Sequence, residues 1–258
     1  MGAEQFADLD VVCVEIYRGG PLSYMTTTGV ELLTRLADEV PVVPTTTRTP
    51  EQYRRIALPA RFRYAVASNG GRILVDGEDD PDWRRGVERE VRASGADLDE
   101  VLSALRGRVD DSWVRSLRTA DDLFCYLVVE PDGQPASFLS DWQEWCSARG
   151  WTASQQGRKI YATPRSLTKS SAVAEVRRRL IDDEVLAADA ELYAAGDGRL
   201  DADLLRYADH AIRPRHGELE ALGWTAPGLT VTEQTGARAG VEILEWFRDR
   251  CPVPIAQT

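Results

Sequence analysis

The chain has 258 residues and a mass of 28.6 kDa, enough for one large domain or two smaller ones. Its 43% hydrophobic and 28% charged residues are typical of a globular protein and exclude a wholly disordered chain. A formal net charge of −11 disfavours nucleic acid and anionic membranes as partners, although a local basic groove would escape this average. No uncharged apolar run approaches the roughly 20 residues of a membrane helix, and the acidic start lacks the plan of a signal peptide.

The basic residues and cysteines narrow the class further. Of the 31 basic residues only Lys159 and Lys169 are lysines, and all the remaining ones are arginines. The four cysteines are scattered, without a CxxC pair, and the histidines are not clustered, so a zinc site is not expected. We expect reduced thiols and a cytoplasmic protein.

The N-terminal part of the chain alternates strand and helix patterns. Apolar, β-branched residues at 11–17 predict a buried strand, and the apolar spacing over 28–38 predicts a helix. Residues 40–43 predict a second buried strand, Pro50 begins a short helix, and residues 63–67 predict a third strand. This order predicts a mostly parallel sheet with helices on its faces.

Residues 73–164 mix hairpins with helices and predict an antiparallel α+β unit. Its predicted elements are a hairpin arm at 72–77, helices at 84–93 and 137–149, strands at 113–117 and 124–129, and a hairpin at 151–163. The α/β rhythm returns near Thr168. We therefore predict an α/β fold: a discontinuous Rossmann-like core of residues 1–72 and 165–258 with a mostly parallel sheet, interrupted by a smaller α+β domain at 73–164.

Residues that follow the predicted strands are candidates for a site, because open parallel sheets bind ligands beyond the carboxyl ends of their strands. Thr46, Thr47 and Arg48 follow the second strand and can hold a phosphate through hydroxyl and guanidinium donors. The alternative is an N-cap of the following helix. Asn69 and Gly70 follow the third strand, as a ligand-facing amide or as a plain turn.

Two further candidates follow the α+β unit. Lys169 opens a helix, where a compact ammonium can neutralise a carboxylate and a phosphoryl oxygen, or can simply be solvated. Asp197 and Asp201 form a Gly-Asp-x-x-x-Asp sequence after an apolar strand. Carboxylates with this spacing suit Mg²⁺, and the alternative is a turn with an aspartate cap.

In this order the motifs resemble those of the haloacid dehalogenase (HAD) superfamily of hydrolases. The chain is similar over nearly its whole length to the sugar-phosphatase and sucrose-phosphatase-like branch, in which a large α+β cap enters between the third strand and the lysine. The resemblance implies a Mg²⁺ cofactor and the following roles: catalysis by Lys169 and Thr46; substrate binding by Thr47, Arg48, Asn69 and Gly70; and metal binding by Asp197 and Asp201.

The first motif of that family departs from its pattern here. The family's nucleophile is the first Asp of a DxDxT sequence after an apolar strand. Asp8 and Asp10 are the nearest match, but no strand-forming run precedes them, and the apolar segment 11–17 follows them. We therefore expect Asp8 and Asp10 to be lead-in residues and the nucleophile strand to lie outside this sequence. The alternative is a degenerate but working motif.

These motifs predict a Mg²⁺-dependent phosphatase-type hydrolase of a small phosphorylated metabolite, such as a sugar phosphate. Its activity is expected to be impaired, because the DxDxT motif is absent. The alternative is a non-catalytic HAD-like binding or scaffold protein. A dinucleotide-binding oxidoreductase is disfavoured, because no GxGxxG sequence follows a predicted strand. The sequence predicts neither nucleic acid nor a membrane as partner, and it leaves the oligomeric state open.

Overall fold

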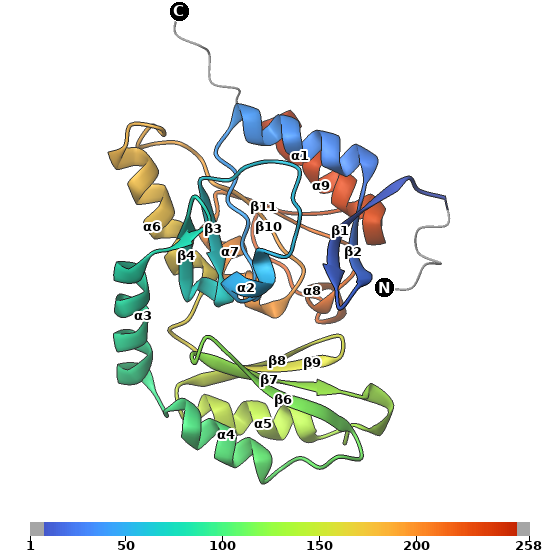
Figure 1. The fold of residues 1–258 in the computed structure, drawn as a ribbon, viewed down its shortest axis with the longest axis vertical. Coiled ribbons are helices and arrows are strands. Elements are labelled where there is room, and N and C mark those ends of the chain that lie inside the picture. Colours follow the sequence, from blue (N-terminus) through green and yellow to red (C-terminus); the bar gives the residue numbers. More distant parts are fainter. Residues whose placement is uncertain (1–7, 252–258) are drawn as a thin grey trace, which may run out of the picture.

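The computed structural model describes residues 8–251. Figure 1 shows an upper part built of helices and short strands and a lower layer built of one larger sheet. The expectation that no strand-forming run precedes Asp8 concerns residues 1–7, which lie outside the described residues. Within the described residues, no helix combines the length and apolar character needed to cross a membrane.

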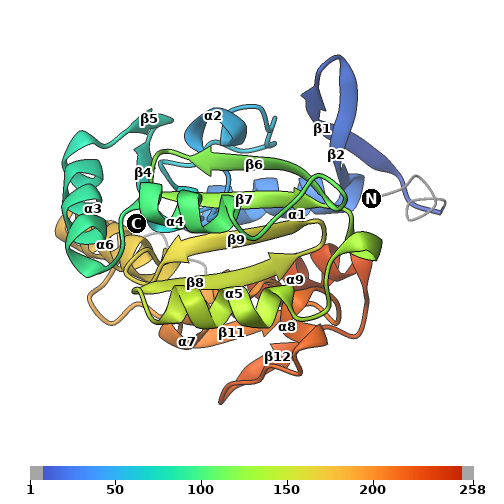
Figure 2. The same cartoon turned by 90° about the horizontal axis from the view of Figure 1, so that it is seen from below.

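The lower layer is an antiparallel sheet with strand order β6-β7-β9-β8. Its strands are β6 (Val114–Ala120), β7 (Phe124–Val129), β8 (Trp151–Gln156) and β9 (Lys159–Pro164). Figure 2 shows that α4 (Leu98–Arg106) and α5 (Phe138–Ser147) cover the face of this sheet that points away from the upper part. The predicted strands, hairpin and helix of this region are confirmed.

The upper part contains three small sheets. A parallel sheet joins β10 (Tyr193–Ala195), β11 (His210–Arg213) and β12 (Leu229–Val231). An antiparallel sheet joins β3 (Tyr64–Ala67), β4 (Arg72–Val75) and β5 (Glu78–Asp79). An antiparallel hairpin joins β1 (Val11–Tyr17) and β2 (Gly20–Thr26) and projects at the right of Figure 1.

The prediction of a mostly parallel sheet is therefore wrong: most sheets are antiparallel and one small sheet is parallel. The segment 11–17 pairs with the next strand because Arg18 and Gly19 both take positive φ, 52° and 78°, as a tight hairpin turn requires. It is also less buried than predicted, with Ile16 64% exposed. Residues 40–43 form no strand, because Pro41 within the segment and Pro44 directly after it have no backbone N–H to donate to a ladder.

Helices complete the upper part. The described helices there are α1 (Thr27–Glu39), α2 (Pro50–Tyr53), α6 (Lys169–Asp182), α7 (Ala202–Tyr207), α8 (Glu218–Ala221) and α9 (Gly236–Arg250), while α3 (Pro81–Ser94) runs down toward the lower layer. Threonine side chains cap several of them, and Thr168 accepts a hydrogen bond from the Ser171 N–H at the start of α6 (3.3 Å). This cap fixes the position at which Lys169 enters the helix.

The apolar residues form two clusters among the described residues. One lies between the lower sheet and helices α4 and α5, around fully buried side chains such as Trp142 and Phe124. The other lies in the upper part, where α6 and α7 pack against β3 and β10 through residues such as Val66 and Val176. Each layer therefore buries its own apolar side chains, which leaves polar side chains to face one another where the layers meet.

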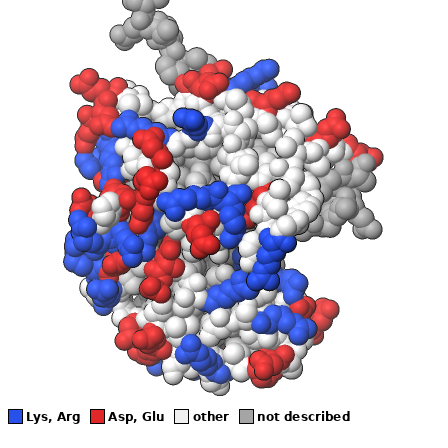
Figure 3. Space-filling model, viewed as in Figure 1, with Lys and Arg blue, Asp and Glu red and all other residues white. Residues whose placement is uncertain are grey.

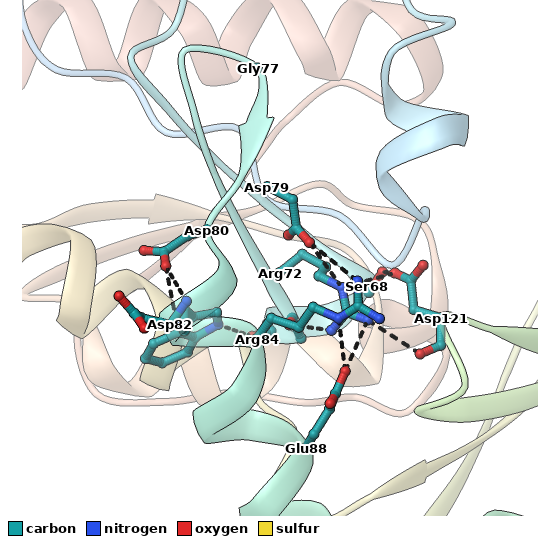
Figure 4. Close-up of polar contacts among 12 residues, drawn as sticks. Ser68, Arg72, Gly77, Asp79, Asp80, Asp82, Arg84, Glu88 and Asp121 are labelled. Carbon is teal, nitrogen blue, oxygen red and sulfur yellow. Dashed lines mark hydrogen bonds and ion pairs between the residues drawn. The ribbon is translucent and has the colours of Figure 1, made fainter.

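A polar cluster around Arg72 ties the lower sheet to the upper part (Figure 4). Arg72, on β4, is 3% exposed and lies 3.8 Å from carboxylate oxygens of both Asp79 and Glu88. Asp121, in the turn between β6 and β7, lies 4.0 Å from Arg72 and accepts a hydrogen bond from the Ser68 hydroxyl. These contacts hold the β6–β7 turn of the lower sheet against the β3–β4 hairpin.

Candidate active site

A cavity of about 450 Å³ lies where the lower sheet meets the upper part. In Figure 3 this face is hollowed between the two layers, and basic side chains border the hollow. Most of the cavity's lining is polar. The residues that line it are Thr45, Thr46, Thr47, Arg48, Ser154, Gln156, Lys159, Tyr161, Lys169, Ala195, Gly196, Asp197, Gly198, Leu200, Asp201 and Glu218. The cavity thus gathers six of the eight residues predicted from the sequence.

The loop that carries Thr46 and Arg48 is fixed by hydrogen bonds to strand β3 and to itself. The Thr46 N–H donates to the Val66 carbonyl (2.9 Å), and Thr45 forms an isolated parallel bridge with the same residue. The Thr46 hydroxyl accepts from the Arg48 N–H (3.1 Å). Because these bonds occupy the backbone, the Thr46 and Arg48 side chains are presented to the cavity from a defined loop.

Glu15 holds the Arg48 guanidinium in place. It is 1% exposed on β1, and its carboxylate accepts from Arg48 (2.7 Å) and from the Ser23 hydroxyl (2.7 Å). Burial alone would raise its pKa, but the hydrogen bonds from Arg48 and Ser23 and the charges of Arg48 and Arg55 lower the pKa of Glu15 below its usual value. Sequence reasoning missed Glu15 because its partner lies 33 residues away.

Lys169 and Asp201 form a buried ion pair. Their side chains are 7% and 9% exposed, and the Lys169 ammonium donates to one carboxylate oxygen of Asp201. The other oxygen accepts from the backbone N–H groups of Asp197 (3.0 Å) and Gly198 (2.9 Å). Asp201 therefore shapes the loop after β10, and its charge is already matched by a cation and two dipoles.

Asp197 is a carboxylate with fewer partners at the same end of the cavity. Burial, together with the nearby charge of Asp201, raises the pKa of Asp197 above its usual value. Its nearest side-chain donor is the Gln156 amide, at 3.4 Å. Burial likewise raises the pKa of Glu218, which accepts from the Arg199 N–H (2.8 Å). Asp197 and Glu218 therefore give the cavity an acidic region. Arg48 and Lys159 line the same cavity and bring positive charge to it.

The expected Mg²⁺ can be tested against these donors. Within residues 8–251, no three His, Cys, Asp or Glu side chains are grouped so that they could hold a metal ion. Asp201 is committed to Lys169 and to the loop, which leaves Asp197 as the less engaged member of the predicted ligand pair. The described residues thus do not assemble a complete Mg²⁺ site.

Asn69 and Gly70 do not line the cavity. The Asn69 side chain is 1% exposed and its amide donates to the Leu167 carbonyl (2.9 Å). Gly70 has φ +100°, and a Cβ built on it would lie 2.0 Å from the Thr168 carbonyl oxygen. Both residues therefore brace the segment that leads into α6 and carries Lys169 to the cavity.

The lower sheet contributes residues that the sequence analysis did not assign to a site. Gln156 pairs with Lys159, and Ser154 pairs with Tyr161, so all four side chains lie on one face of the sheet. This face lines the cavity. One signal was present in the sequence, since Lys159 is one of two lysines among 31 basic residues.

Asp8 and Asp10 lie elsewhere. They line a separate cavity of about 690 Å³, together with residues at the start of α1 and along α9 such as Thr27 and Arg238. Neither is among the residues that line the cavity of Asp197.

Comparisons with known proteins support a fold relationship. No family model matches the chain, and none of the curated proteins matches it in sequence. Among solved structures, it is similar to the sucrose-phosphatase from Synechocystis sp. PCC6803 in complex with sucrose and phosphate, with a TM-score of 0.64 and 13% identity over 85% of this chain and 92% of that one.

Two further structures give the same result. One is a trehalose-6-phosphate phosphatase related protein (TM-score 0.55, 19% identity, 93% of this chain and 95% of that one). The other is the C-terminal domain of the trehalose-6-phosphate phosphatase of C. albicans (TM-score 0.56, 11% identity, covering 93% of this chain and 90% of that one). The chain thus has a mixed α/β fold that is similar, at low sequence identity, to the folds of these three structures.

Proposed function

We propose that this chain carries a phosphatase-type site of the HAD superfamily that binds a small phosphorylated metabolite, such as a sugar phosphate. One observation carries the proposal: Thr46, Arg48, Lys169, Asp197 and Asp201, predicted from separate segments of the sequence, line one cavity. The division into a core of residues 1–72 and 165–258 and a cap of residues 73–164 belongs to the same proposal.

The proposed roles follow from the contacts of each side chain. The Thr46 and Thr47 hydroxyls and the Arg48 guanidinium bind the phosphoryl oxygens, because hydroxyl and fork-shaped donors suit that group. Lys169 sets the charge at the inner end of the cavity and holds Asp201. Asp201 in turn positions Asp197 through the backbone of the loop. Asn69 and Gly70 support the entry of Lys169.

Turnover by the 258-residue chain is expected to be slow. Within the described part of the chain, the acidic side chains that line the cavity are Asp197, Asp201 and Glu218, and two of them are already engaged by Lys169 or by backbone N–H groups. The Asp8-Leu9-Asp10 sequence lines a different cavity. Removal of a covalent nucleophile from comparable enzymes lowers turnover on the order of 10⁶-fold. We therefore expect this cavity to bind a phosphorylated ligand well and to hydrolyse it slowly.

Calorimetry and a phosphate-release assay test this proposal together. Inorganic phosphate and glucose 6-phosphate are titrated into the chain, and release of phosphate from p-nitrophenyl phosphate is followed with Mg²⁺ present. We expect binding that Arg48→Met weakens about tenfold or more, with release close to background. Arg54→Met is the matched control, because Arg54 bonds the Gly77 carbonyl outside the cavity.

Each outcome bears on a different part of the proposal. If neither compound binds, the phosphate site is wrong. If both bind and phosphate is released rapidly, a working nucleophile is present, and the expectation of slow turnover is wrong. If Arg54→Met weakens binding as much as Arg48→Met does, the effect of Arg48 is not local to the cavity.

A further inference from the structure

The face of the lower sheet that lines the cavity carries an unusual set of side chains. Cross-strand pairs place Lys159 beside Gln156, Tyr161 beside Tyr126, and Tyr126 beside Arg118. Residues paired across strands share a face, so these side chains all project on the cavity side of the sheet. The opposite face is apolar and is covered by α4 and α5.

Two buried tyrosines pack against each other on this face, next to Lys159. Tyr126 and Tyr161 are 6% and 5% exposed, and their ring centroids lie 5.5 Å apart. The Lys159 ammonium lies 5.2 Å from the centroid of the Tyr126 ring. Tyr161 and Thr47 both line the cavity, so this face and the loop of Arg48 border the same space. The position of Lys159 is thus restricted by its surroundings rather than by an acidic partner.

The cations around the cavity differ in their counter-ions. Arg48 is paired with Glu15, and Lys169 is paired with Asp201. Among the ion pairs of residues 8–251, neither Lys159 nor Arg118 has an acidic partner. Partial desolvation and the positive charges of Arg48 and Arg118 lower the pKa of Lys159. Lys159 thus brings to the cavity wall a positive charge that is not taken up in an ion pair among these residues, and such a charge favours an anion from solution.

We propose that Lys159 recognises a second anionic group of the ligand, a carboxylate or a second phosphoryl group, from the cap side of the cavity. This inference rests on the proposed function, in which the first phosphoryl group lies near Thr46, Arg48 and Lys169. It narrows the substrate class to phosphorylated sugar acids and bisphosphates. The sucrose named with the structural neighbour is an uncharged sugar, so the substrate class proposed here differs.

Ligands that differ in one anionic group test the inference. Glucose 6-phosphate has a neutral sugar, 6-phosphogluconate adds a carboxylate, and fructose 1,6-bisphosphate adds a phosphoryl group. We expect the unmodified chain to bind at least one of the last two about tenfold more tightly than glucose 6-phosphate. Lys159→Met should reduce this preference to within about twofold, while Lys159→Arg should retain most of it.

Arg158→Met is the matched control. It removes one positive charge from the adjacent residue, whose guanidinium contacts Glu130 and which does not line the cavity. Preference for the second anion should survive in this variant. The comparison of the carboxylate ligand with the bisphosphate ligand then shows which kind of anion Lys159 takes.

The possible failures are distinguishable. If Lys159→Met weakens glucose 6-phosphate, inorganic phosphate and the doubly anionic ligands equally, Lys159 belongs to the phosphoryl site; the inference is then wrong and the proposed function stands. If all ligands bind equally well to the unmodified chain and to Lys159→Met, the inference is also wrong. If the unmodified chain binds none of them, the proposed function and the inference both fail.

Lysine acylation provides a second readout that needs no variant. The chain has two lysines, and Lys169 is buried in its ion pair, so acetylation by an N-hydroxysuccinimide ester should modify Lys159 first. Peptide mapping by mass spectrometry separates this product from the acetylated N-terminus. A doubly anionic ligand should slow modification of Lys159 severalfold more than glucose 6-phosphate does at equal occupancy. Equal protection by both would contradict the inference.

Discussion

Lys159 and Lys169 line the same cavity from different layers, and among residues 8–251 only Lys169 of the two has an acidic ion-pair partner. Lys169 enters from α6 and pairs with Asp201, whereas Lys159 lies on β9 over the ring of Tyr126. The cavity thus contains two lysines with different roles. The charge of Lys169 is neutralised by Asp201 within the fold, whereas the charge of Lys159 can interact with a ligand.

Lys169→Met should destabilise the protein strongly. It leaves the Asp201 carboxylate buried without its cation, and the loss of one partner of a buried ion pair typically costs about 3–5 kcal/mol. The measurement is the free energy of unfolding in urea. The double variant Lys169→Met with Asp201→Asn should recover part of this loss, because the buried charge is removed as well. A single variant within about 1 kcal/mol of the unmodified chain would contradict the buried pair.

Glu15→Gln should lower stability in a pH-dependent way. Against the effect of burial, Arg48 and Ser23 lower the pKa of Glu15 below its unfolded value of 4.5. A lowered pKa stabilises the folded state fully above about pH 4.5, and this contribution is lost as the pH falls through the folded pKa. The gap in unfolding free energy between the two proteins should therefore be largest near neutral pH and shrink toward pH 3.

An exposed carboxylate serves as the control for this profile. Glu51→Gln, on α2, should shift stability by less than about 0.5 kcal/mol at any of these pH values. A gap for Glu15→Gln that grows as the pH falls would show that the sign of the Glu15 effect is wrong.

Gly70→Ala should be more harmful than Gly77→Ala. Both glycines have positive φ, +100° and +87°, so both substitutions add backbone strain of about 1–2 kcal/mol. A Cβ at Gly70 would also lie 2.0 Å from the Thr168 carbonyl oxygen, whereas a Cβ at Gly77 meets nothing within 4 Å. Gly70→Ala should therefore lower the unfolding free energy further and also weaken phosphate binding, through the displaced start of α6. Equal effects of the two substitutions would show that the close approach is unimportant.

Asp197→Asn should strengthen the binding of inorganic phosphate in the presence of a chelator. The Asp197 carboxylate lines the cavity close to Asp201, and its negative charge opposes an anion when no divalent cation is present. Calorimetry should show affinity for phosphate raised severalfold. Asp203→Asn removes an equal charge outside the cavity, beside Arg206, and should leave the affinity unchanged. Weaker binding by Asp197→Asn would mean that this side chain itself binds the anion.

The site was more predictable from sequence than the sheets around it. Thr46, Arg48, Lys169 and Asp197 were predicted because each occupies a fixed place relative to a strand or a helix start, and the structure brings them to one cavity. Local patterns also predicted β7, β8 and α6. These features depend on residues that are close together in the sequence.

What could not be predicted depends on long-range pairing. The segment 11–17 has the composition of a buried central strand, but a two-residue turn folds it against β2 at the edge of the molecule. Residues 40–43 have the composition of a strand, but they gain no ladder partner. The roles of Glu15 and Lys159 emerge only when β1 and β9 are placed beside the Thr46–Arg48 loop. Composition sets local preference, while the partner strand is chosen by the whole fold.

The central claim is that this cavity binds a phosphoryl group. A crystal structure of the protein, determined from crystals grown with inorganic phosphate, tests this claim most directly. We predict a phosphate ion in the cavity within hydrogen-bond distance of the Thr46 hydroxyl and the Arg48 guanidinium, with the Lys169–Asp201 pair intact. An empty cavity at a phosphate concentration that saturates binding in calorimetry, with phosphate bound elsewhere on the protein, would contradict the claim.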